Sequence, residues 1–288
     1  VRAGLRTGLN MVITGFPKNH HGYMCGYEPG TARRGKFGLP RIIHFQDPAE
    51  KSTYLANLFE NTYIQDVLER NQIKNEKEVL DNLIRIVASS VGSLTNPHKI
   101  ANTFKSTKNI PINSNTVSLY LDHFIDAFLL NKVYRYDVKG RKYIGSPQKY
   151  YFIDQGLRNA LLNFRQQEEN HIIENIIYNE LILRGYNVDV GAVNHRYKDS
   201  AGKDIKTWLE IDFIASKASK KVYIQSALNI DTREKREQEI ASLKKVNDSF
   251  KKIVVVRDHI NPWIDDYGIN YVGIREFLSG YYIDLEMV

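Results

Sequence analysis

Two carboxylate residues two positions apart, Glu210 and Asp212, lie in a stretch whose residues alternate as in a β-strand. Alternation predicts that both side chains point to one face of that strand. A third acid, Glu174, lies in an earlier helical stretch, and Gln225 lies in the next strand, which we expect to pair with the first. Carboxylate and carboxamide oxygens suit a hard cation such as Mg²⁺ or Mn²⁺. The spacing therefore predicts a candidate metal site among these residues, with ordinary surface acids as the alternative.

A second group of residues is suited to binding nucleic acid. The stretch from Lys132 to Lys149 holds six basic residues and one acid, Asp137, around a predicted turn. Short polar side chains at the start of the preceding helix could contact phosphates or base edges. Such residues also cap helices, so they gain weight only beside the basic hairpin. The candidate nucleic-acid contacts are Asn113, Asn115, Thr116, Ser118, Lys139, Arg141 and Lys142.

These residues must be positioned by two sets of elements. Four amphipathic helices are predicted first, followed by strands at residues 133–138 and 149–153 joined by a turn. Short helices followed by a hairpin are the outline of a winged helix, and a small helical bundle with an added hairpin is the alternative. The residues expected to cap or precede the four helices are Asp47, Asn75, Asn96 and Ser114.

The chain after residue 154 has the element order of an α/β domain. A helix is predicted over residues 167–184, three strands follow it, and a charged helix and a further strand come next. The fold class is therefore α+β, with a winged-helix-like domain over about 47–153 and an α/β domain over about 154–280. Residues 281–288 form a tail.

Composition bounds these interpretations. A chain of 288 residues and 33.3 kDa is long enough for two domains, and 42% hydrophobic with 25% charged residues is a globular composition. We find no apolar run of the roughly 18 residues that a membrane span requires. The single cysteine, Cys25, excludes a disulfide framework. We expect a cytoplasmic protein that does not bind membranes.

The first 46 residues form an irregular, glycine-rich and basic segment that we expect to lie outside the core. Seven basic residues and one acid, Glu28, lie before residue 42, so the net charge of +7 falls mostly there. The run Gly30–Lys36 resembles a phosphate-binding P-loop, but Phe37 replaces the hydroxyl residue that would hold Mg²⁺. We therefore expect no nucleotide site in this chain.

Two motifs carry a resemblance to a known family. The stretch Ser146–Asn159, with Ser-Pro-Gln-Lys-Tyr-Tyr-Phe-Ile-Asp-Gln-Gly-Leu-Arg-Asn, and the segments Asn163–Glu168 and Glu174–Leu181 are similar to the C-terminal portion of bacterial and archaeal ATP-binding proteins of the AAA superfamily. The resemblance extends from about Gly35 to Leu278. It implies that a P-loop ATPase domain, absent from this sequence, precedes a winged helix and a domain like the PD-(D/E)xK nucleases.

The resemblance also assigns roles to residues. It implies that Glu174 is the helix acid and Asp212 the strand acid of the nuclease-like core, and that the acid-x-lysine motif falls on Gln225-Ser226-Ala227. Alanine at position 227 cannot hold or polarise an attacking water as a lysine ammonium would. The resemblance therefore implies a restriction-endonuclease-like domain whose motif is incomplete.

Our interpretation from the sequence is the C-terminal portion of an AAA-family ATPase, with a DNA-binding winged helix and a degenerate nuclease-like domain. One alternative is a weakly active metal-dependent DNA nuclease that recruits Lys220 or Lys221; the other is a protein-interaction module without nucleic acid, which the near-neutral charge after residue 41 favours. The expected cofactor is Mg²⁺ or Mn²⁺, with ATP only in the missing domain. The expected partners are double-stranded DNA and further copies joined through that domain.

Overall fold

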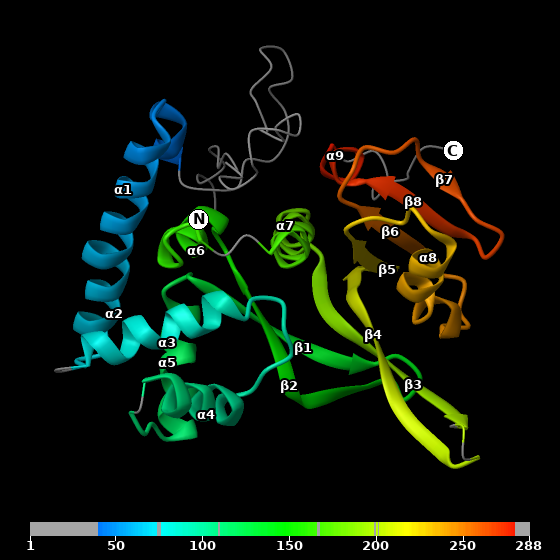
Figure 1. Cartoon of the computed structure of the whole chain (residues 1–288), viewed down its shortest axis with the longest axis horizontal. Helices are drawn as coiled ribbons and strands as arrows, with labels where there is room; N and C mark the ends of the chain where they lie inside the picture. The colour runs from blue at the N-terminus through cyan, green and yellow to red at the C-terminus, as the bar shows by residue number, and fades with distance from the viewer. Residues whose placement is uncertain are drawn as a thin grey trace. The chain divides into compact units, whose positions relative to one another are not determined.

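The computed structural model describes residues 40–73, 76–108, 110–165, 168–198, 200 and 202–279 (Figure 1). Two compact units make up the chain: Val1–Lys132 with Tyr150–Glu168, and Val133–Lys149 with Glu169–Val288. The predicted division near residue 153 differs from this one, because most of the hairpin belongs to the second unit. The Gly30–Lys36 run, Cys25, and most of the glycine-rich segment lie outside the described residues.

The first unit is helical. Asp47 caps its first long helix as predicted, since its carboxylate accepts a hydrogen bond from the amide nitrogen of Ala49 over 2.9 Å. The cap of the fourth predicted helix is Asn113 and not Ser114, because the Asn113 side chain accepts from Asn115 N over 2.8 Å. The elements are η1 (Pro40–His44), α1 (Pro48–Leu58), the π-helical η2 (Phe59–Ile64), α2 (Gln65–Arg70), α3 (Lys77–Ser89), α4 (Pro97–Lys108), α5 (Ser114–Asp126) and α6 (Gln155–Leu161).

A mixed sheet with flanking helices forms the second unit. Its eight strands are hydrogen-bonded in the order β2-β1-β3-β4-β5-β6-β8-β7. The pairs β3–β4, β4–β5 and β7–β8 are antiparallel, and β1–β3, β5–β6 and β6–β8 are parallel. The elements are β1 (Leu130–Asp137), β2 (Lys142–Phe152), α7 (Glu169–Leu183), β3 (Asn187–Lys198), β4 (Asp204–Lys217), β5 (Lys220–Ala227), α8 (Arg233–Ile240), η3 (Leu243–Lys245), β6 (Lys251–Val256), β7 (Trp263–Ile264), β8 (Ile269–Gly273) and α9 (Ile274–Leu278).

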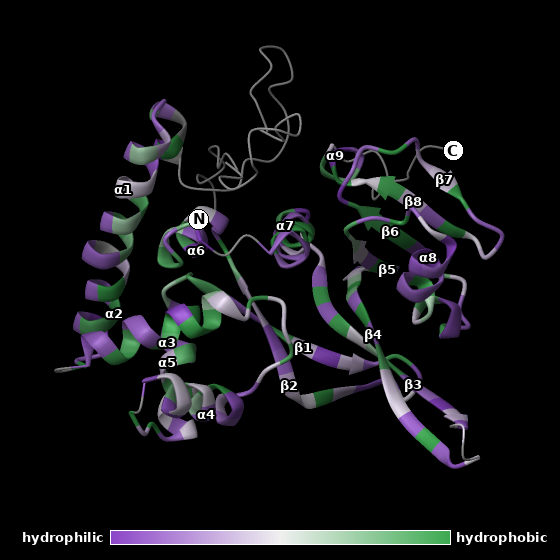
Figure 2. Ribbon diagram, in the orientation of Figure 1, coloured by the Kyte–Doolittle hydropathy of each residue, from purple (hydrophilic) through white to green (hydrophobic). Residues whose placement is uncertain are grey.

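The helices α7 and α8 pack on this sheet in different ways. Ten consecutive residues of α7, from Ile172 to Leu181, are buried, so this helix has no solvent-facing stripe over that stretch. By contrast, α8 is hydrophilic along most of its length and buries only Ile240, which packs with Leu243 against the sheet (Figure 2). No helix among the described residues is both long and apolar enough to span a membrane. The architecture is mixed α and β, as the sequence predicts.

A register shift in the β3–β4 ladder decides which way the β4 side chains point. Asp189 pairs with Ile214 while Gly191 pairs with Ile211, so β4 has one residue more than β3 in this interval. Ile211 and Ile214 both pack with the core under α8. The two residues between them point the other way, as the Phe213 ring lies 6.2 Å from the Tyr178 ring of α7. Asp212 follows the alternation set by Glu210 and Ile211, and the bulge turns Phe213 to the same side, toward α7.

Candidate functional site

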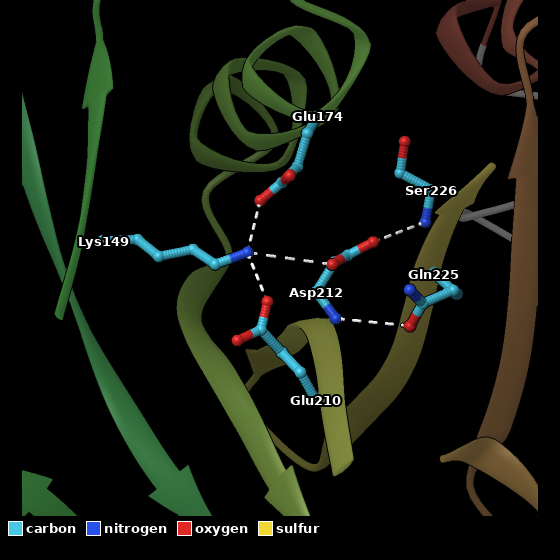
Figure 3. Close-up of polar contacts among 6 residues, drawn as sticks. All are labelled: Lys149, Glu174, Glu210, Asp212, Gln225 and Ser226. Atoms are coloured by element: carbon cyan, nitrogen blue, oxygen red, sulfur yellow. Dashed lines mark hydrogen bonds and ion pairs between the residues drawn. The ribbon is translucent and has the colours of Figure 1, made fainter. Parts of the chain in front are cut away.

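A single buried ammonium group lies among three carboxylates in the second unit (Figure 3). The Nζ atom of Lys149 is 2.7 Å from Oε1 of Glu174, 2.6 Å from Oε1 of Glu210 and 3.8 Å from Oδ1 of Asp212. The Lys149 side chain is only 3% exposed. Four ionisable groups from β2, α7 and β4 therefore meet at one point, where Lys149 is buried and the Glu210 side chain is 33% exposed.

Local sequence explains how each element delivers its group. Lys149 precedes Tyr150, Tyr151 and Phe152, all buried at the end of β2, so the strand carries its lysine into the interior. Glu174 lies within the fully buried stretch of α7 and is itself buried. A charge in such surroundings requires a partner, because its transfer out of water is unfavourable. Lys149 is that partner.

Asp212 is fixed by the backbone of the neighbouring strand. Its Oδ2 atom accepts a hydrogen bond from the amide nitrogen of Ser226 on β5 over 2.8 Å. Its own amide nitrogen donates to Oε1 of Gln225 over 3.4 Å. The bulge in β4 allows both contacts, since it places the Asp212 backbone beside Gln225 while the carboxylate points toward α7 (Figure 3). The carboxylate is therefore held in one orientation.

Gln225 and Ala227 occupy the other side of β5. Tyr223 and Ala227 belong to the apolar core that includes residues of α8 and η3, and Gln225 shares their face by alternation. The Gln225 side chain is also hydrogen-bonded to Glu239 of α8. The structure thus brings Glu174 and Asp212 together at Lys149, whereas the Gln225 oxygen contacts the β4 backbone and Ala227 packs in the core.

The electrostatics of the cluster follow from burial and from an excess of negative charge. Burial alone would lower the pKa of Lys149, but the carboxylates of Glu174, Asp212 and Glu210 raise it above its usual value. Burial and the neighbouring Glu174 carboxylate raise the pKa of Asp212 to about 8, although Lys149 and the Ser226 amide act in the opposite direction. The surroundings therefore favour the protonated form of Asp212 and the charged form of Lys149.

Oxygen ligands for a cation are present, but they surround an ammonium group. Among the described residues, no group of three or more His, Cys, Asp or Glu side chains is arranged to hold a metal ion as it stands. We attribute this to Lys149, because its Nζ atom occupies the point on which the carboxylates converge. A cation could be coordinated there only if the ammonium withdrew.

The residues predicted to contact nucleic acid fall in both units. Asn113, Asn115, Thr116 and Ser118 lie at the start of α5, in the first unit, where Asn113 is the helix cap. Lys139, Arg141 and Lys142 lie at the β1–β2 turn, in the second unit. Lys139 Nζ donates to the carbonyl oxygen of Asn194 on β3 over 3.4 Å. Of these three basic residues, Lys139 therefore contacts β3.

Sequence reasoning missed two members of the cluster. Lys149 was assigned to a basic hairpin, and Glu210 was noted beside Asp212 but was not chosen as a site residue. The signal for Lys149 was its position directly before three large apolar residues, where an unpaired charge would be buried. For Glu210 the signal was its position two residues before Asp212, which predicts that both side chains point to the same face. This prediction is correct because the bulge begins only after Ile211.

Comparison with protein families gives a match for the first part of the chain. Residues 1–107 match the family model described as FeGP cofactor biosynthesis protein, fibrillarin family. Of this interval the structure describes 40–73 and 76–107. Those residues contain η1, α1, η2, α2, α3 and most of α4. The Lys149 cluster lies outside the matched interval.

Individual relatives carry no functional name. An uncharacterized protein of Haemophilus influenzae is 34% identical over 236 residues, which are 82% of this chain and 54% of the relative. An uncharacterized protein of Methanothermobacter thermautotrophicus is 83% identical over 42 residues, 15% of this chain and 8% of the relative. The chain thus spans about half the length of the first relative and a small part of the second.

A solved structure, the protein VC1899 from Vibrio cholerae, aligns with a TM-score of 0.26 and 13% identity, over 82% of this chain and 56% of that one. A TM-score this low does not show that the two proteins share a fold.

These comparisons correct the resemblance stated from the sequence. The matching family model is described as an FeGP cofactor biosynthesis protein of the fibrillarin family, and not as an AAA-superfamily ATPase. The H. influenzae relative is uncharacterized and gives no support to an ATPase. The interpretation as a C-terminal ATPase portion with a DNA-binding winged helix and degenerate nuclease is therefore wrong on these findings. Its alternatives, a weak nuclease or an interaction module, gain no support either.

Proposed function

We propose that the second unit binds a divalent cation, Mg²⁺ or Mn²⁺, through the carboxylates of Glu174, Glu210 and Asp212. Lys149 acts as the internal cation that holds these groups together when no metal is bound. The observation that supports this proposal most directly is the convergence of three carboxylates on one buried Nζ atom, the farthest 3.8 Å away.

Charge balance favours a cation. One ammonium cannot neutralise three ionised carboxylates, and the raised pKa of Asp212, caused by burial and by Glu174, reflects this imbalance. A divalent cation in place of the ammonium would lower the excess negative charge from two to one with all three carboxylates ionised. Mg²⁺ and Mn²⁺ both prefer carboxylate and carbonyl oxygen ligands, and the cluster offers no sulfur or imidazole. A cation bound there would supply Lewis-acid activation of a coordinated water.

The role of Gln225 in this proposal is structural support of the ligand Asp212. Its Oε1 atom accepts a hydrogen bond from the Asp212 amide, which positions the β4 backbone at the bulge. The sequence-based alternative, in which this oxygen is itself a ligand, would require the side chain to leave the α8 side of β5. The two roles predict different effects of substitution.

Metal titration of purified protein tests the cation site. We expect Mn²⁺ to raise the melting temperature of the parent, because a ligand that binds only the folded state stabilises it. Asp212→Asn and Glu210→Gln should reduce that rise, while Glu234→Gln, an exposed acid on α8, serves as the matched control and should not. A rise of equal size in all four proteins would refute the proposed ligands.

The finer fold assignments also remain proposals. The succession of α3, α4 and α5 followed by β1 and β2 supports a winged-helix-like arrangement. The order α7, β3, β4, β5, α8, β6 supports a restriction-endonuclease-like arrangement of the second unit. An experimental structure of the chain, compared with representatives of both folds, tests these assignments.

A second candidate function rests on the family match over residues 1–107. We propose a role in FeGP cofactor biosynthesis for that part of the chain, because the matching family is described by that process. Adding the purified chain to an extract that lacks the family's protein should restore cofactor formation. An extract that stays inactive, beside one restored by an authentic family member, would contradict this role.

A further inference from the structure

An arginine on the cluster's face of the sheet has a buried Nε atom that makes no hydrogen bond to any residue that the structure describes. Arg135 on β1 is 8% exposed, and its Nε atom is buried without a hydrogen bond. Within the described part of the chain its guanidinium makes no hydrogen bond or ion pair that would offset its burial. Buried charged groups are normally paired, so an orphaned one calls for an explanation.

Strand pairing locates Arg135 relative to the carboxylates. On β1, Arg135 and Asp137 point to the same face because they are two residues apart. Asp137 is directly opposite Ala192 of β3, and Ala192 is directly opposite Glu210 of β4. Arg135 therefore lies on the Glu210 face. Only β3 separates β1 from β4, which places the two strands about 10 Å apart.

We infer that Arg135 is an anion-binding residue, and that the ligand of this site is a small molecule bearing a phosphate or carboxylate group. This inference rests on the proposed cation site, which it extends to a class of ligand. A planar guanidinium binds either oxyanion through paired N–H donors. The carboxylate cluster repels such a ligand unless a divalent cation neutralises it, so the cation and the anion should bind cooperatively.

The melting temperature of the ligand-free protein distinguishes an anion-binding role of Arg135 from a purely structural one. A buried charge without a partner is unfavourable, so Arg135→Met should raise the melting temperature in the absence of ligand. An arginine retained only for packing would instead lower it on replacement. Arg135→Lys keeps the charge but removes the paired donors, and it covers the case in which Arg135→Met does not fold.

The test measures binding of inorganic phosphate by calorimetry, with and without Mg²⁺, in the parent, both Arg135 variants and Arg196→Met. Arg196 is an exposed arginine on β3 and controls for the loss of one positive charge. We expect phosphate to bind the parent, more tightly with Mg²⁺, and about tenfold or more weakly in both Arg135 variants. The control should bind like the parent. Acetate in place of phosphate then distinguishes a carboxylate ligand from a phosphate ligand.

Three outcomes separate this inference from the proposed cation site. Equal oxyanion binding in the parent and the Arg135 variants, or none in any protein, would overturn the anion site whatever Mg²⁺ does. Mg²⁺ binding that persists in that case would leave the cation site intact. Oxyanion binding that depends on Arg135 without any Mg²⁺ response would support the anion site and contradict the cation site.

Discussion

The amide nitrogen of Ser226 donates a hydrogen bond to Oδ2 of Asp212 over 2.8 Å, across two adjacent strands of the sheet. Asp212 lies in the β4 bulge between Ile211 and Ile214, and it points toward α7 as alternation with Glu210 and Ile211 predicts. With one carboxylate oxygen held by the backbone, the other is directed at Lys149, 3.8 Å away. Backbone pairing between β4 and β5 therefore fixes the orientation of a carboxylate in the candidate site.

Removal of the Lys149 ammonium group should lower the stability of the protein. We expect Lys149→Met to lower the free energy of unfolding by about 3–5 kcal/mol, because the buried carboxylates of Glu174 and Asp212 and the partly exposed one of Glu210 lose their counter-charge. Mn²⁺ should restore part of this loss if a cation can replace the ammonium. Urea denaturation with and without Mn²⁺ measures both effects. A variant as stable as the parent would show that the cluster is better hydrated than its burial indicates.

The raised pKa of Asp212 makes stability depend on pH in a defined direction. A carboxyl group that binds its proton more tightly in the folded state stabilises the fold at low pH, fully so below the unfolded pKa near 4. That contribution, on the order of a few kcal/mol, is lost as pH rises through about 8, the pKa of Asp212 in the fold.

Asp212→Asn isolates this effect, since other buried acids titrate in both proteins. The difference in unfolding free energy between Asp212→Asn and the parent should grow in favour of the variant between pH 5 and pH 8. Chemical denaturation at several pH values without metal gives this difference. A pH-independent difference would mean that Asp212 is ionised throughout.

Substitution of Gln225 distinguishes a side chain that only supports Asp212 from one that is itself a metal ligand. If its oxygen only accepts the Asp212 amide hydrogen bond, Gln225→Ala should cost about 1 kcal/mol of stability and leave the Mn²⁺ affinity nearly unchanged. Calorimetric titration of the variant with Mn²⁺ checks the second statement. A loss of affinity as large as that in Asp212→Asn would instead assign Gln225 as a ligand.

The cap of α5 gives a test that does not involve the site. Asn113→Ala should destabilise the protein by about 1 kcal/mol, because the Asn115 amide loses its acceptor. Ser114→Ala, at the neighbouring position predicted from sequence to be the cap, should have a smaller effect. Equal losses in thermal denaturation would contradict the cap assignment.

Periodicity and capping residues predicted most elements but not the site. Asp47 and the apolar stripe of α3 correctly located helices, and alternation correctly located β4, because local patterns determine both kinds of element. The β4 bulge could not be predicted, since it depends on pairing with β3. Lys149 approaches Glu174 only through tertiary packing, so spacing assigned it to a basic hairpin instead.

Direct measurement of Mn²⁺ binding, by electron paramagnetic resonance of the free ion, tests the central claim about this chain. The parent should remove Mn²⁺ from solution, and Asp212→Asn should bind it about tenfold or more weakly, because one carboxylate ligand is lost. Glu234→Gln should bind like the parent. Free Mn²⁺ that is undiminished by the parent protein, or binding unchanged in Asp212→Asn, would contradict a cation site at Glu174, Glu210 and Asp212.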